Sequence, residues 1–151
     1  MKTLRDASVQ REIRTRLQSL TAEDAARWGK MSVHQMICHL RDACWVGLGE
    51  KKVAMVAIPM PRPVMKWMAL QTPLHWPHGL KSPPEVAQDV DGTRPVEFES
   101  DRAALLSAVD QFCNHLTEPC VPHPFFGGMT AHDWWRWGYL HADHHLRQFG
   151  R

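Results

Sequence analysis

The chain has 151 residues, of which 44% are hydrophobic and 23% charged, and its formal net charge is +2. These values are typical of one globular domain, residues 1–151, that buries a core without disulfides. The small charge and the lack of a lysine- or arginine-rich run argue against a nucleic-acid partner. No stretch has the length of a transmembrane helix and the N-terminal segment lacks the apolar run of a secretory signal, so we expect a cytoplasmic protein without membrane contact.

Hydrophobic spacing predicts two long helices in the first third of the chain. Residues from 7 to about 20 carry apolar side chains at helical intervals, which predicts the first helix. Ser32 and Gln35 form a capping signature that opens a second, stronger helix. Gly47 and Gly49 are expected to end that helix, since glycine commonly terminates helices.

The character of the sequence changes between residues 53 and 95, where prolines recur. Residues 64–70 are expected to form a short helix between proline breaks, and the rest an irregular crossover or lid. A third long helix is predicted from near Asp101, and Thr130 with Asp133 caps a fourth that runs to about Gln148. Four long helices without a convincing strand predict an all-α four-helix bundle, with a Pro-rich crossover between the second and third long helices.

The chain contains four cysteines, and no pair has the C-x-x-C spacing of a zinc ribbon or a thioredoxin-type site. We therefore interpret them as free thiols in a reducing compartment. The four residues are Cys38, Cys44, Cys113 and Cys120.

The last helix carries the strongest chemical signal. On a helical wheel one face holds Trp134, Trp137, Gly138, His141, His145 and Gln148, and the opposite face holds Arg136, Asp143 and Arg147. The tryptophans bury the most area, so their face should point inward, with His141 and His145 one turn apart. Two inward imidazoles are costly unless both are satisfied, and a shared divalent cation would take a lone pair from each. Zinc peptidases use the same spacing, but Ala142 stands where their general-base glutamate would be, which argues against a peptidase.

A third ligand would have to come from another helix. His39, at the edge of the apolar stripe of the second helix, is the best candidate, and His34 lies closer to the solvated side. The alternative is that these are ordinary core histidines paired with backbone carbonyls, with His144 as a hydrogen-bonding partner. From the residues alone both interpretations remain open. The remaining candidates, His75, His78 and His132, are expected at the surface.

Two stretches resemble the signatures of DinB-like metal-binding bundles. The run His141-Ala-Asp-His-His145-Leu-Arg-Gln148 is similar to H-x-x-[HY]-H-x-x-Q, and Ser32-Val-His-Gln-Met-Ile-Cys-His39-Leu is similar to the helix whose His-Leu pair supplies the first ligand. The similarity covers most of the chain, and the chain resembles an uncharacterised branch of that superfamily. One departure is Arg147, where the family usually has glycine. The resemblance implies a four-helix bundle in which His39, His141 and His145 hold a divalent ion, often zinc or nickel, and many members are homodimers.

Some relatives in that superfamily transfer low-molecular-weight thiols or act on activated substrates. Our first hypothesis is therefore a metal-dependent transferase or hydrolase for a small-molecule substrate, with such a thiol as a candidate substrate. Gln148 would orient a bound ligand or water, and Asp42 would either hold the His39 ring or be an ordinary surface acid. Trp67 and Trp76 would roof the pocket. The alternative hypothesis is a non-catalytic, metal-stabilised bundle with a binding or stress-related role.

Overall fold

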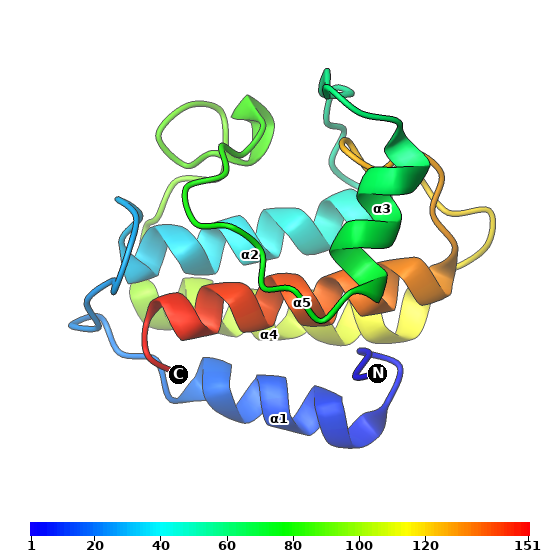
Figure 1. The fold of residues 1–151 in the computed structure, drawn as a ribbon. Helices are drawn as coiled ribbons and strands as arrows, with labels where there is room; N and C mark the ends of the chain where they lie inside the picture. Colours follow the sequence, from blue (N-terminus) through cyan, green and yellow to red (C-terminus); the bar gives the residue numbers. More distant parts are fainter.

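The computed structural model describes residues 1–151 and is entirely helical, with no β-strand. Its elements are α1 (Ala7–Gln18), α2 (Val33–Leu48), α3 (Arg62–Gln71), the 3-10 helix η1 (Pro84–Val86), α4 (Phe98–His115) and α5 (Ala131–Gln148). The four longest helices, α1, α2, α4 and α5, lie alongside one another, and α3 crosses over α5 (Figure 1). None of the helices combines the length and the apolar composition needed to cross a bilayer.

Both capping boxes expected from the sequence are present. The Ser32 hydroxyl accepts the Gln35 backbone N–H at 3.1 Å, and the Gln35 side chain accepts the Ser32 N–H at 2.9 Å. Thr130 and Asp133 make the same reciprocal pair at the start of α5. Each box satisfies backbone N–H groups that have no partner within the helix, so it fixes where α2 and α5 begin.

Helix α4 starts at Phe98, earlier than the expected start near Asp101. The Glu97 side chain is the reason, because its carboxylate accepts the backbone N–H groups of Glu99 and Ser100. Glutamate is not a favoured capping residue, which is why the sequence pattern did not indicate this start.

Gly47 does not end α2 as expected. It lies within the helix, and Gly49, with a φ of 81°, forms the left-handed C-cap. A Cβ atom at Gly47 would lie 2.4 Å from the Phe112 ring, and one at Gly138 would lie 2.8 Å from it. The two glycines therefore allow α2 and α5 to approach α4 closely around this buried ring.

The core draws on every long helix, on α3 and on the connecting segments. Completely buried apolar side chains include Ile13, Leu17, Leu20, Met36, Ile37, Leu70, Leu105, Phe112, Trp134 and Leu146. Burying each such side chain contributes at most about 1.5–3 kcal/mol, which is an upper bound. This burial fixes the helix faces on which the candidate site residues stand.

Arg136 is not on a solvated face, as the helical wheel suggested. Only 7% of it is exposed. Its Nε donates to the Leu70 carbonyl at 3.0 Å and its Nη1 donates to the Lys2 carbonyl at 2.9 Å. Helix α3 and the N-terminal residues cover this side of α5, and neither contact is visible in the periodicity of α5.

The segment between α2 and α4 is attached to α2 through Asp42, which has no exposed surface. Its carboxylate accepts the Thr93 N–H at 2.8 Å and the Thr93 hydroxyl at 2.6 Å. Gln88 donates to it at 3.1 Å, and Lys51 forms an ion pair with it at 2.9 Å. Both expectations for Asp42 are therefore wrong, because it is neither a surface acid nor the hydrogen-bond partner of His39. It holds the segment that follows η1 against α2.

Candidate metal centre

Three histidines from two helices form a compact cluster. His39 comes from α2, and His141 and His145 come from successive turns of α5. Their ring centroids are 4.8–5.0 Å apart, and every pair of rings meets edge-on at 69–76°. Nitrogen atoms of all three rings lie within 4.8 Å of one another, and the two Nε2 atoms of His39 and His141 are 3.1 Å apart.

The His39 ring is oriented by the crossover segment. Its Nδ1 lies 2.8 Å from the Val86 carbonyl oxygen, in η1. A carbonyl oxygen can only accept, so Nδ1 carries the proton and Nε2 keeps its lone pair. That lone pair faces the other two histidines, as a metal ligand requires.

Gln148 orients the His145 ring in the same way. The Gln148 amide nitrogen donates to the Trp28 carbonyl at 2.8 Å, which fixes the direction of the amide group. Its oxygen, 2.9 Å from the Nδ1 of His145, must then accept the proton of that nitrogen. The Nε2 of His145 is left with its lone pair. Gln148, which is 5% exposed, therefore positions a ring through its two hydrogen bonds.

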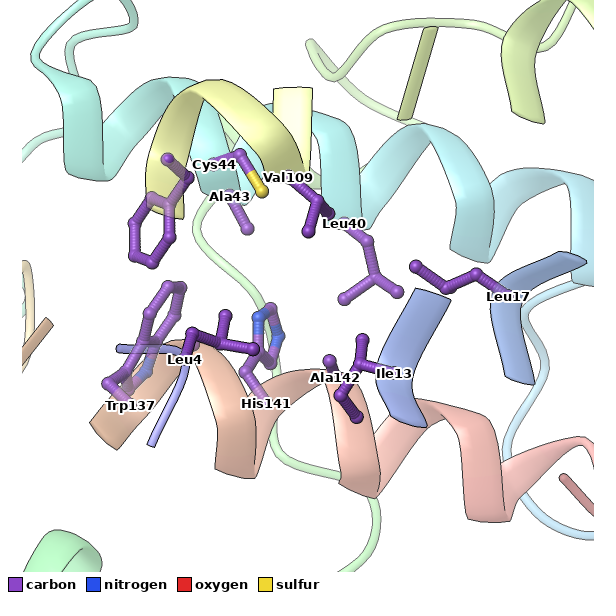
Figure 2. A pocket seen from close by; sticks show the side chains of 12 residues that line it. Leu4, Ile13, Leu17, Leu40, Ala43, Cys44, Val109, Trp137, His141 and Ala142 are labelled. Carbon is purple, nitrogen blue, oxygen red and sulfur yellow. The ribbon is translucent and has the colours of Figure 1, made fainter. Parts of the chain in front are cut away.

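The His141 ring closes the cluster on the core side. It stacks on Trp137, with centroids 4.6 Å apart, and borders a small cavity of about 20 Å³ (Figure 2). The cavity lies among α1, α2, α4 and α5, and has room for about one water molecule. Its other walls are mainly apolar: Leu4, Ile13, Leu17, Leu40, Ala43, Cys44, Val109, Phe112, Trp137, Gly138 and Ala142. A ligand cannot reach the histidines through this core.

Burial keeps the three imidazoles neutral. Desolvation is the main cause that lowers the pKa of His39, and it lowers the pKa of His141 and His145 well below their ordinary value. The mutual proximity of the rings adds to the effect on His141 and His145. No carboxylate is hydrogen-bonded to any of the three rings. The Val86 carbonyl and the Gln148 side chain accept the Nδ1 protons of His39 and His145.

These residues fit a divalent ion. Nitrogen ligands at about 2.0–2.1 Å in tetrahedral geometry stand about 3.3–3.4 Å apart. The distance of 3.1 Å between His39 and His141 is close to that value, and the limit of 4.8 Å leaves only small ring movements for the third ligand. The neutral rings and the two fixed tautomers supply the lone pairs that such an ion binds.

A comparison with known proteins gives a family without an assigned activity. The family model described as "Protein of unknown function (DUF1569)" matches residues 3–151. The chain belongs to this family. No curated protein and no solved structure matches it. The function of this DUF1569 chain must therefore be argued from its site.

A second group of ligand-type side chains in this DUF1569 chain consists of His34, Cys38 and Asp101. Asp101 accepts from His34 at 2.8 Å, from Arg41 at 3.1 Å and from the Val96 N–H at 2.9 Å. Burial raises the pKa of the Cys38 thiol to about 11, so the thiol stays protonated. The group is a buried ion-pair cluster. His34 was expected nearer to the solvent. The sequence of α2 alone could not predict its hydrogen bond to Asp101 of α4.

The other predictions for individual residues have mixed outcomes. His75, His78 and His132 are exposed, as expected, and all four cysteines are free thiols. Trp76 lies beside the cluster, 6.1 Å from His141 between ring centroids. Trp67 is 60% exposed, so its predicted place in a pocket roof is wrong.

Proposed function

We propose that this chain is a divalent-metal-binding protein of the DinB-like superfamily, with His39, His141 and His145 as the ligands. The observation that carries the proposal is the cluster of three neutral imidazoles, that of His39 buried and those of His141 and His145 half-buried, whose ring centroids form a nearly equilateral triangle. We include in it the four-helix bundle formed by α1, α2, α4 and α5, with residues 1–151 as a single domain and α3 within the Pro-rich crossover.

Zinc or nickel suits a ligand set made only of nitrogen, and iron and copper are the next candidates. A divalent ion held by three neutral imidazoles would keep its full charge and an open position, and would bring the pKa of a water or thiol there towards neutrality. The chain's own residues prepare that position. Val86 and Gln148 fix two rings, and the apolar core behind His141 keeps water from that side.

We propose further that the site belongs to a metal-dependent transferase or hydrolase that acts on a small molecule, with a low-molecular-weight thiol as one substrate. The resemblance to thiol-transferring relatives supports this activity. The side of the cluster away from the core supports it as well, because Trp76 and His144 there, with ring centroids 6.2 Å apart, supply surfaces for a substrate. A cytoplasmic location agrees with four free thiols, and a homodimer follows from the same resemblance.

The second candidate function is a metal-stabilised bundle without catalysis, in a binding or stress-related role. It is favoured because no carboxylate at the cluster is free to act as a general acid or base. Asp42 is the carboxylate whose charge acts on His39, and it is already committed to Thr93, Gln88 and Lys51. No hydrogen bond joins a carboxylate to the three rings, so proton transfer would depend on the substrate or on a neutral histidine.

Metal analysis of protein purified without an affinity tag tests the metal proposal. We expect about one equivalent of a divalent transition metal, and a content below about half an equivalent after incubation with zinc would refute it. His141→Gln should lose the ion. His132→Gln is the matched control, because His132 is exposed on the same helix and should leave the metal content unchanged.

A turnover screen separates the two functions. Common cellular thiols are incubated with activated electrophiles, with and without a chelator. A rate that requires the protein and disappears with the chelator supports the transferase. A protein that loses melting temperature on chelation, yet shows no turnover, supports the non-catalytic bundle.

A further inference from the structure

A second pocket lies beside the histidine cluster, on the side of α5 that α3 and the N-terminal residues cover. Its volume is about 300 Å³, which is at the lower end of the range for small-molecule sites. The walls come from α5, from residues 72–76 after α3, and from the N-terminal segment. The residues used below are Lys2, Trp76, Arg136, Tyr139, Asp143 and Arg147.

Arg136 is the unusual residue of this pocket. It is 7% exposed, and it donates only to two backbone carbonyls, so its charge has no carboxylate partner. The other buried arginine, Arg41, pairs with Asp101. Burial lowers the pKa of the Arg136 guanidinium, which expresses the cost of keeping this charge out of water. A buried charge without a counter-ion is costly unless an anion approaches it.

The other charges of the pocket do not supply that anion. Asp143 is the acidic residue in the lining, and both Arg16 and Arg147 bind it at 2.9 Å. Lys2 is paired with Glu12 at 2.6 Å. Lys2, Arg16 and Arg147 share the two carboxylates of Glu12 and Asp143, so these ion pairs leave a positive charge over, and Arg136 adds another.

The remaining wall is largely apolar and aromatic. Trp76 and Tyr139 both line the pocket, together with Leu74 and Leu140. The Trp76 indole N–H donates to the Ala69 carbonyl at 3.0 Å, which fixes the ring in place. A flat or aliphatic body of a few carbon atoms therefore matches the wall, while an anionic group matches Arg136.

We propose that this pocket binds a small organic anion, with its carboxylate or phosphate group on Arg136 and its body against Trp76 and Tyr139. This binding site shares Trp76 and His144 with the open side of the histidine cluster, but its anion lies on Arg136, so it does not depend on the metal proposal. It is adjacent to the histidine cluster, because Trp76 lies 6.1 Å from His141 and His144 also lines the pocket.

Fluorine NMR tests the proposal directly, because Tyr139 is the only tyrosine of the chain. Protein made with 3-fluorotyrosine gives one resonance, which reports on this pocket. Benzoate and phenyl phosphate should shift it saturably, and the tighter of the two identifies the anionic group. Benzamide, which matches benzoate in shape but has no charge, should bind at least about tenfold more weakly. The proposal would be overturned if benzamide bound as tightly as benzoate, or if neither anion gave a shift that saturates.

Two variants locate the charge. Arg136→Gln should weaken benzoate about tenfold or more and remove its advantage over benzamide. Arg14→Gln is the control, since Arg14 is an exposed arginine of α1 that pairs with Asp110. If Arg136→Gln fails to fold, the comparison of benzoate with benzamide on the unaltered chain still decides. The titration is repeated with 1,10-phenanthroline, a neutral chelator. Benzoate binding that disappears would assign the anion to a metal ion and refute a separate site, whatever the metal analysis shows.

Discussion

Replacing Gln148 by leucine tests how the candidate metal centre is oriented. The change removes the acceptor of the His145 Nδ1 proton and the donor to the Trp28 carbonyl. Loss of such an outer hydrogen bond typically lowers metal affinity by about 10–100-fold, or about 1.4–2.7 kcal/mol. Loss of the partly buried hydrogen bond to Trp28 lowers the free energy of unfolding of the metal-free protein by about a further 1 kcal/mol. Zinc affinity and stability should therefore both fall.

Gln148→Glu separates the two effects. A carboxylate accepts the His145 proton more strongly than an amide does, so zinc affinity should be kept or increased. The same carboxylate cannot donate to the Trp28 carbonyl, so the metal-free protein should still lose stability. Only a ring that is oriented through its Nδ1 predicts these opposite directions.

The assay is competition for zinc with a chromophoric chelator, alongside urea unfolding of the metal-free protein. Gln10→Leu is the matched control, because the Gln10 amide donates to the Leu4 carbonyl at 2.7 Å and to none of the three histidines. It should lower stability and leave zinc affinity unchanged. The reasoning fails if Gln10→Leu weakens zinc as much as Gln148→Leu does, or if Gln148→Leu leaves zinc affinity unaltered.

Three further predictions concern the fold around the site. Burial lowers the pKa of His123 to about 3, below its unfolded value, so its protonation opposes folding as the pH falls. Stability should drop by about 2 kcal/mol more between pH 7 and pH 5 than in His123→Phe, and parallel urea-derived curves would contradict this. Gly47→Ala should cost about 1–3 kcal/mol by overlap with Phe112, recovered in part by adding Phe112→Leu, whereas Gly128→Ala, which meets no atom, should be neutral in thermal unfolding. For Asp101, burial acts to raise the pKa, but its hydrogen bonds and a neighbouring guanidinium lower it overall. The stabilisation by the Asp101 carboxylate is complete above its unfolded pKa and is lost as the pH falls through its folded pKa. In Asp101→Asn the free energy of unfolding should therefore fall less steeply with pH below about pH 4. An unchanged slope in that range would refute this.

Local sequence features were sufficient to predict the pair of histidines on α5. Capping residues set where the helix begins, and the tryptophans set which face is buried, so His141 and His145 had to point inward together. His39 was harder to predict, since a stripe edge on α2 is compatible with either solvent or core. The close approach of α2, α4 and α5 around Phe112 turns His39 towards the core. That approach depends on Gly47, which the sequence pattern suggested as a helix end.

Contacts made by the irregular segments could not be predicted. The partner of His39 is a backbone carbonyl, at Val86, and any residue type can provide one. Asp42 illustrates the same limit, because its donors Gln88 and Thr93 come from a segment with no periodic pattern. Arg136 was placed on the solvated face because the wheel shows only α5, whereas α3 and the N-terminal residues cover that face.

Two connecting segments therefore orient the imidazole rings that the helices bring together. The helices bring three imidazoles to within 5.0 Å of one another between ring centroids, but helix geometry alone leaves the tautomer of each ring undetermined. The carbonyl of Val86 acts directly on His39, and the carbonyl of Trp28 acts through Gln148 on His145. Both place the proton on Nδ1 and leave the lone pair on Nε2. Orientation that is fixed before a ligand arrives reduces the entropy lost on binding. Ordinary core histidines would need only a hydrogen bond at either nitrogen, whereas here the Nδ1 bonds of His39 and His145 leave both Nε2 atoms in the cluster for a shared cation.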